Sequence, residues 1–240
     1  LPKINKTQFE RRLKYAETFR ESFAKGFPHD DVKSYADFYE ETVKLFDSKT
    51  TELFDINKES GSVKNLYGNS RFARGLLLAR RLIQNNVRYV EVQLGGWDGQ
   101  HGNAGTAANR TNAMDAPIAA LLQDLSSQGM LDETMVVLTT EFGRTPFTQS
   151  AADQLGKGRD HNNAGFTVWM AGAGLKPGIA FGESDETGYR AAVDPVSWHD
   201  FHATVLHLLG LDHERLTFYH NGIERRLTNV HGHVIREILA

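Results

Sequence analysis

The chain has 240 residues, no cysteine and a nearly balanced charge, with 27 Lys and Arg against 30 Asp and Glu. This length provides enough interior for one large domain or two small ones. The lack of cysteine excludes disulfides, zinc–cysteine sites and thiol nucleophiles. A net charge of -3 offers no global basic field for nucleic acid, and no apolar run approaches the roughly 20 residues that cross a bilayer. We expect neither nucleic acid nor membrane insertion.

The amino-terminal part of the sequence has the apolar spacing of amphipathic helices. One pattern runs from Phe9 to Phe23 and stops before Pro28, and a second begins at Asp30. The aromatic side chains of both patterns are expected to face the core. We predict a helical segment over 1–69 that packs on a second region, 70–240.

A third helix is predicted over 72–85, after a polar stretch and with Ser70 as its cap. Leucine, isoleucine and alanine side chains are expected to form its apolar side. Four arginines are expected outside that side: Arg71, Arg74, Arg80 and Arg81.

Beyond Val87 the pattern changes to short strands that alternate with helices. Strands are predicted at 87–94, 134–139 and 166–171, helices at 113–127 and 201–209, and a hairpin around Asn221-Gly222. Alternating strands and helices predict an α/β fold with a mostly parallel central sheet and flanking helices. Ligands of such sheets bind beyond the carboxyl ends of the strands.

Polar residues with metal-binding side chains follow or precede these strands. The candidates are Asp98, His101, Glu141, Asp160 and His161, with His199 and His202 before the last helix. Carboxylate and imidazole groups at successive strand ends predict a divalent metal site, with zinc first and calcium, magnesium or manganese as alternatives. The guanidinium groups of Arg144 and Arg159 suit a phosphate or sulfate oxyanion, although surface ion pairs would explain them equally well.

Several motifs occur together in an order that resembles a known family. They include Gly95-Gly96-Trp97-Asp98, Glu141-Phe142-Gly143-Arg144-Thr145-Pro146, Gly158-Arg159-Asp160-His161 and His199-Asp200-Phe201-His202. The region from about residue 59 to 240 resembles domain-of-unknown-function family 1501, a bacterial group usually placed in the alkaline phosphatase and sulfatase superfamily. The resemblance implies an alkaline phosphatase-like fold, of which 70–240 would be the carboxyl-terminal part.

The resemblance also implies roles for the candidate residues. Asp98, His101, Glu141 and His161, with Asp160 beside it, are similar to the family's metal ligands, and Arg144 and Arg159 would hold the ester. His199 and His202 would contact the metal ligands or the substrate. The sequence departs from the pattern at three places: two residues separate Asp98 from His101, Phe142 stands where many members have His, and Asn162 replaces an aromatic residue.

The leading hypothesis is a metal-dependent hydrolase of small anionic phosphate or sulfate esters. Its nucleophile is expected outside this chain, in an amino-terminal half or another subunit that the resemblance implies. Relatives begin with a twin-arginine signal, so a periplasmic or exported location is expected. A non-catalytic metal- or ligand-binding module of a larger exported protein is the alternative, and a phosphomutase of the same superfamily is a third option.

Overall fold

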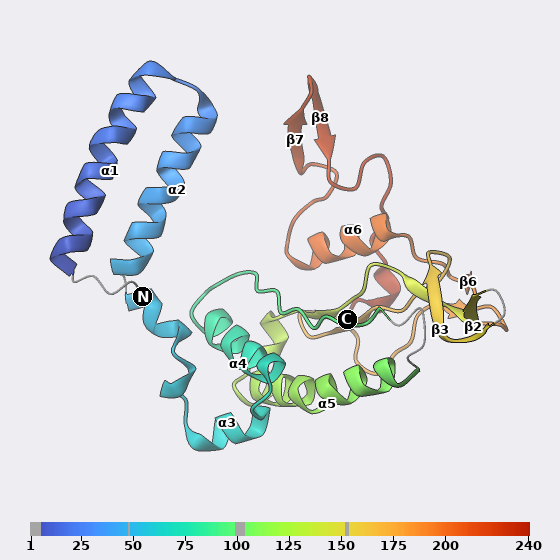
Figure 1. Cartoon of the computed structure of the whole chain (residues 1–240). Helices are drawn as coiled ribbons and strands as arrows, with labels where there is room; N and C mark the ends of the chain where they lie inside the picture. The colour runs from blue at the N-terminus through green and yellow to red at the C-terminus, as the bar shows by residue number, and fades with distance from the viewer. Residues whose placement is uncertain (1–5, 48, 99–103, 152–153) are drawn as a thin grey trace. The chain divides into compact units, whose positions relative to one another are not determined.

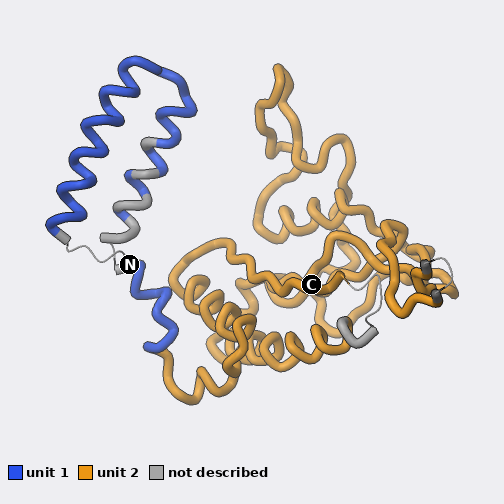
Figure 2. The backbone as a smooth tube through the Cα atoms, viewed as in Figure 1, with its two compact units in different colours: residues 1–58 blue, residues 59–240 orange. Residues whose placement is uncertain are grey.

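The computed structural model of the chain describes residues 6–47, 49–98, 104–151 and 154–240. The chain divides into two compact units, unit 1 with residues 1–58 and unit 2 with residues 59–240 (Figure 2). In the part of the chain that the structure describes, none of the helices combines the length and apolar character needed to span a membrane.

Unit 1 is a helical hairpin followed by two short 3-10 turns (Figure 1). Helix α1 spans Lys6–Gly26 and helix α2 spans Asp30–Asp47, while η1 (Lys49–Phe54) and η2 (Ile56–Lys58) complete the unit. The Phe27 amide donates to the Phe23 carbonyl oxygen at 2.9 Å, which closes α1. The predicted helices on either side of Pro28 are therefore confirmed. The expectation that their aromatic side chains face the core is wrong for Phe19, Phe23, Tyr35 and Phe38, each of which is more than half exposed.

Three helices of unit 2 enclose most of its apolar core. They are α3 (Gly61–Tyr67), α4 (Arg71–Gln84) and α5 (Ala104–Ser127), and α4 packs against α5 (Figure 1). Ser70 caps α4 as predicted, because its hydroxyl accepts the Ala73 amide at 3.1 Å. The buried apolar side chains of these helices are Tyr67, Ala73, Leu76, Leu77, Ala79, Ala120, Leu121 and Leu125.

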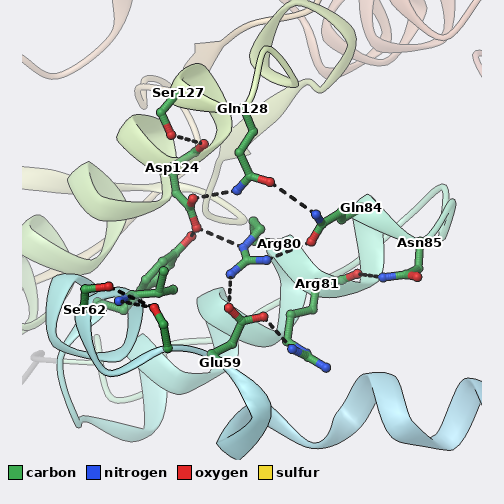
Figure 3. A network of polar contacts seen from close by, with 12 residues as sticks. Glu59, Ser62, Arg80, Arg81, Gln84, Asn85, Asp124, Ser127 and Gln128 are labelled. Carbon is green, nitrogen blue, oxygen red and sulfur yellow. Dashed lines mark hydrogen bonds and ion pairs between the residues drawn. The ribbon is translucent and has the colours of Figure 1, made fainter.

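A network of charged and polar side chains joins the three helices (Figure 3). The Arg80 guanidinium lies 2.9 Å from both Glu59 Oε2 and Asp124 Oδ2, and the Tyr67 hydroxyl donates to Asp124 Oδ2 at 2.9 Å. The prediction that Arg80 lies outside the packed face of its helix is wrong, since this residue is only 4% exposed. Gln84 accepts a further N–H of Arg80 at 2.8 Å. We call Glu59, Tyr67, Arg80 and Asp124 the buried network.

The strands of unit 2 form separate antiparallel pairs. Among the described residues there are four two-stranded sheets. Their pairs are β1 (Val136–Leu138) with β4 (Trp169–Ala171), β2 (Gly143–Ala151) with β3 (Gln154–Asn162), β5 (Glu183–Ser184) with β6 (Ala191–Val193), and β7 (Thr217–His220) with β8 (Ile223–Arg226). The predicted α/β fold with a mostly parallel central sheet, and with it the alkaline phosphatase-like architecture, is wrong.

The first predicted strand shows why the parallel sheet does not form. Residues 87–98 have no regular secondary structure. Val90 and Val92 are both half-buried, and Val92 lies against the helices, where its Cγ1 is 3.0 Å from the position that a Cβ on Gly75 of α4 would take. The alternating pattern from which we predicted a strand shows only that one face of the segment is half-buried. Either a helix or a neighbouring strand can cover such a face.

The last helix, α6 (Trp198–Leu208), is joined to the segment that follows the β7–β8 hairpin. Ser197 and Asp200 form a capping box at its start. Asp200 Oδ1 also accepts the His233 amide at 2.7 Å, and the Thr204 hydroxyl accepts the Ile235 amide at 3.0 Å. The Asn221-Gly222 hairpin is confirmed, and both residues have the positive φ of its tight turn.

Candidate functional site

The hairpin of β2 and β3 carries four of the nine predicted site residues: Arg144, Arg159, Asp160 and His161. Arg144 on β2 lies opposite His161 on β3 in the strand register. The register shifts between Arg144 and Thr148, and Pro146 lies in this interval. Because proline has no amide hydrogen to donate to a partner strand, it is tolerated at such irregularities. The last four residues of the distinctive Glu-Phe-Gly-Arg-Thr-Pro run therefore begin a bulged strand, and Glu141 and Phe142 directly precede it.

Two buried contacts fix the end of this hairpin that bears Arg144 and His161. Asn162 is buried, and its side chain donates to the Tyr189 carbonyl oxygen at 2.6 Å and accepts the Ala164 amide at 3.0 Å. A Cβ on Gly143 would lie 2.0 Å from the Gly165 carbonyl oxygen, so only glycine fits between these two chain segments. The backbone under Arg144 and His161 is thus held by packing and by hydrogen bonds.

Asp98, Arg144 and His161 converge on one point although 63 residues separate the first from the last. Asp98 Oδ1 lies 3.5 Å from Arg144 Nη1 and 3.8 Å from His161 Nε2. The Asp98 side chain is 71% exposed, the His161 side chain 45% and the Arg144 side chain 28%. We call these three residues the exposed cluster. Its carboxylate, imidazole and guanidinium groups are accessible to a ligand from solvent.

The Phe142 ring packs against the exposed cluster. Its centroid lies 4.2 Å from that of the His161 ring, and Arg144 Cζ lies 5.8 Å from the Phe142 centroid. This places a cation over an aromatic face and restricts the orientation of the imidazole. Phe142 stands where the family resemblance led us to expect a histidine ligand. In this chain that position supports His161 through packing.

Thr145 links the two strands beneath the cluster. Its hydroxyl accepts the Asp160 amide at 3.1 Å and donates to the Phe147 carbonyl oxygen at 2.8 Å. The Arg159 side chain donates to the Thr145 carbonyl oxygen at 3.4 Å, and the Arg159 carbonyl oxygen accepts from Arg144 Nη1 at 3.3 Å. Asp160 Oδ1 accepts the His161 amide at 2.7 Å. These contacts make Arg159 and Asp160 supports of the hairpin around Arg144 and His161.

His199 and His202 belong to an aromatic group on α6. The His202 ring stacks on Trp198 at 5.6 Å, and the His199 ring meets that of His231 at 5.0 Å. Trp198 in turn packs on Phe166 at 4.7 Å. Partial burial, and then the charge of His199, lower the pKa of His202. Both predicted substrate contacts therefore lie beside aromatic or imidazole rings, those of Trp198 and His231.

The other predicted ligands are Glu141 and His101. Glu141 is exposed and directly precedes Phe142. His101 lies outside the described residues. Within the described ranges, no three or more His, Asp or Glu side chains are grouped closely enough to hold a metal ion. The two predicted ligands that the structure brings together are Asp98 and His161.

Sequence reasoning missed Phe142, Thr145 and Asn162 as parts of the site. Phe142 and Thr145 lie inside the most distinctive motif, which is the signal that could have identified them. Asn162 directly follows His161, and its role depends on Tyr189 and Ala164, which the sequence does not place beside it.

The fold and the site define a class of two-unit protein. The first unit is helical, and the second combines α-helices with antiparallel strand pairs and carries an exposed Asp–Arg–His cluster. The model of the DUF1501 family, described as a protein of unknown function, matches residues 2–239, and the chain belongs to this family. No curated protein and no solved structure matches the chain significantly.

Proposed function

We propose that the exposed cluster binds a divalent metal ion, with zinc the first candidate, and that the protein hydrolyses small phosphate or sulfate esters there. The observation that carries the proposal is the convergence of Asp98, Arg144 and His161 on one exposed point. Such a set combines metal-ligand donors with a guanidinium group that pairs with oxyanions.

The distance between the two proposed ligands supports binding to a single ion. Zinc lies roughly 2.0–2.2 Å from an imidazole nitrogen or a carboxylate oxygen, so two ligands at the tetrahedral angle are about 3.4 Å apart, a separation that a small rotation of the exposed Asp98 side chain can reach. Asp98 Oδ1 and His161 Nε2 are 3.8 Å apart. Calcium, magnesium and manganese remain alternatives because Asp98 supplies an oxygen donor.

Arg144 is placed to bind the ester next to this ion. Its Nη1 lies 3.5 Å from Asp98, which is long for a charged hydrogen bond. An ester oxyanion that binds Arg144 would therefore have to replace only this weak contact with Asp98. The Phe142 ring covers one side of His161 and Arg144 and limits the approach of water there.

Each residue of the exposed cluster has a separate role in the proposed reaction. Asp98 and His161 would hold the ion, which when bound supplies positive charge that stabilises the charge developing on the transferred group. Arg144 would donate N–H bonds to the non-bridging oxygens of the ester and fix its orientation. The attacking group is expected outside this cluster.

Calorimetric titration of zinc into the full chain tests the binding step. Asp98→Ala and His161→Ala should each lower zinc affinity by at least about tenfold, because each removes a direct ligand. Asp115→Ala and His220→Ala remove the same types of side chain from exposed positions elsewhere and serve as matched controls. Equal affinity in all five proteins would contradict the proposed site.

Hydrolysis of an aryl phosphate and an aryl sulfate tests the chemical step. Turnover that requires zinc and is lost in Arg144→Ala would support the hydrolase. Zinc binding that depends on Asp98 and His161 but is accompanied by no turnover of either ester, even in a longer form of the protein, would favour the non-catalytic binding module.

A further inference from the structure

Helix α1 of unit 1 carries a row of exposed aromatic side chains. Tyr15, Phe19 and Phe23 follow one another at intervals of four residues, which places them along one face of the helix. They are 62%, 75% and 54% exposed. Large aromatic side chains contribute strongly to interfaces, so a row of this kind on a helix is typical of a contact surface.

A second face of α1 is half-buried and lies at a different angle. Phe9, Leu13 and Ala16 are half-buried, whereas the aromatic row is open to solvent. With 100° of rotation per residue, the centres of these two faces are about 90° apart. A helix in a four-helix bundle packs against two neighbours and needs two apolar faces roughly at right angles. Helix α1 has both faces.

Helix α2 also offers exposed aromatic side chains for such a neighbour. Tyr35 is 64% exposed and Phe38 is 67% exposed. The short turn at Pro28 makes α1 and α2 antiparallel, so Phe19 of α1 and the Tyr35–Phe38 stretch of α2 stand at similar distances along the chain from the turn. In a second copy of the hairpin placed side by side with the first, Phe19 of one copy can contact the Tyr35–Phe38 stretch of the other.

The charges of the two helices identify the partner as a second copy of this chain. Helix α1 contains six basic and three acidic residues, whereas α2 contains six acidic and two basic residues. Residues 1–58 contain 11 of each sign. Such a unit attracts neither polyanions nor anionic lipid as a whole, but it complements itself when the basic helix of one copy lies beside the acidic helix of another.

We infer that unit 1 is a dimerisation element in which the helical hairpins of two copies form a four-helix bundle. A twofold axis along the bundle places each α1 between its own α2 and that of the partner, with helices of like charge on the diagonals. All neighbouring helices are then antiparallel, and Tyr15, Phe19 and Phe23 are buried against the partner's α2.

Sedimentation equilibrium of the full chain tests this inference. The wild-type protein should dimerise, and added salt should weaken the dimer. Phe19→Glu should raise the dimer dissociation constant by at least about tenfold, because it places a carboxylate in the apolar contact. Tyr89→Glu, at an aromatic residue of unit 2 that is 78% exposed, is the matched control. Far-UV circular dichroism should report unchanged helix content in both variants.

The absence of cysteine from the chain allows a direct test of the arrangement. Chains with Phe19→Cys and chains with Phe38→Cys are mixed and oxidised, and they should form a disulfide-linked heterodimer. Tyr89→Cys replaces Phe19→Cys in the control mixture. Equal yields in the two mixtures would overturn the bundle.

Other occupants of the aromatic row give different results. The protein could instead be monomeric over the whole concentration range, and the thiol of a Phe19→Cys variant could be protected from a labelling reagent. This result would show that unit 2 covers the aromatic row, and it would overturn the inference. A monomer that binds vesicles of neutral phospholipid through Phe19 would overturn it in favour of a lipid surface.

Discussion

Two arginine-centred clusters in unit 2 contain similar chemical groups but differ in burial and in distances. In the buried network, Arg80 contacts Glu59 and Asp124 at 2.9 Å each and is almost inaccessible to solvent. In the exposed cluster, Arg144 and His161 lie 3.5 and 3.8 Å from one carboxylate oxygen of Asp98. The first arrangement satisfies its charges internally. The second leaves its charges accessible to solvent, and in our proposal that accessibility allows it to bind a ligand.

The pKa values in the buried network agree with this difference. Burial alone would raise the pKa of Glu59, but the hydrogen bonds and charges of Arg80 and Arg81 outweigh it and lower that pKa. Burial would likewise lower the pKa of Arg80, and the contacts with Glu59 and Asp124 raise it. Burial and the hydrogen bond to Asp124 raise the pKa of the Tyr67 hydroxyl. The charged forms of Glu59 and Arg80 are thus stabilised by their partners.

The largest expected effect comes from removal of the arginine from the buried network. Arg80→Ala leaves Glu59 and Asp124 without their main counter-charge, and the loss of one partner of a buried ion pair costs about 3–5 kcal/mol of unfolding free energy. Urea unfolding measures this loss. Arg144→Ala is the matched control in the exposed cluster, where the expected loss is about 0–1 kcal/mol. Equal losses in the two variants would remove the distinction between the clusters.

The next effect concerns the backbone beneath the exposed cluster. Gly143→Ala introduces a Cβ only 2.0 Å from the Gly165 carbonyl oxygen and forces the hairpin to shift. Such overpacking costs about 1–3 kcal/mol, and zinc affinity should fall with it. Gly61→Ala is the control, since a Cβ there has no atom within 4 Å. Thermal unfolding and zinc titration of both variants would decide whether packing at Gly143 positions the cluster.

A smaller effect is expected at the tyrosine of the buried network. Because the pKa of Tyr67 is higher in the folded protein than in the unfolded chain, its contribution is fully present below about pH 10 and is lost as the pH rises towards the folded pKa. Tyr67→Phe removes the hydrogen bond to Asp124, worth about 1 kcal/mol, and should flatten this alkaline loss.

The acid limb of the stability curve depends on Glu59. Its pKa is lowered on folding, so its contribution is present above the unfolded value of 4.5 and is lost as the pH falls through the folded pKa. Asp185 and Asp200 also have lowered pKa values and contribute to the same limb. Glu59→Gln should therefore reduce the slope of the unfolding free energy against pH on this limb without abolishing it. Urea unfolding between about pH 6 and pH 3, the range over which carboxylates titrate, measures this slope.

The smallest effect on stability is expected for Asp98→Asn. Exposed ion pairs are worth about 0–1 kcal/mol, so this variant should unfold within that margin of the wild type. Loss of zinc binding without loss of stability would separate the two clusters most clearly. A destabilisation comparable to that of Arg80→Ala would show that Asp98 has a structural role.

The helices could be predicted from sequence because their signals are local. The caps at Ser70 and Ser197 and the apolar spacing of α4 and α6 lie within one or two turns of the residues they govern. The burial of Arg80 could not be predicted in this way, because its partners Glu59 and Asp124 lie 21 and 44 residues away. The sequence does not show that these partners lie beside Arg80. A prediction from sequence therefore places an arginine that has other arginines near it on the surface.

Strand pairing is not a local property, and this is where prediction failed. The apolar runs at 134–139 and 166–171 do form paired strands, but antiparallel ones, and composition does not distinguish the two directions. Asp98 and His161 lie 3.8 Å apart, but not at the carboxyl ends of parallel strands. The prediction relied on the carboxyl ends of parallel strands, whereas the structure brings His161 to Asp98 through a bulged antiparallel hairpin.

One carboxylate couples two segments that are distant in sequence. Asp200 completes the capping box of α6 and also accepts the His233 amide. The start of this helix is therefore fully stabilised only after the chain has been synthesised beyond residue 233. We expect α6 to fray at its amino-terminal end on ribosome-bound chains that are shorter than this, and to become protected from hydrogen exchange together with the segment that covers it.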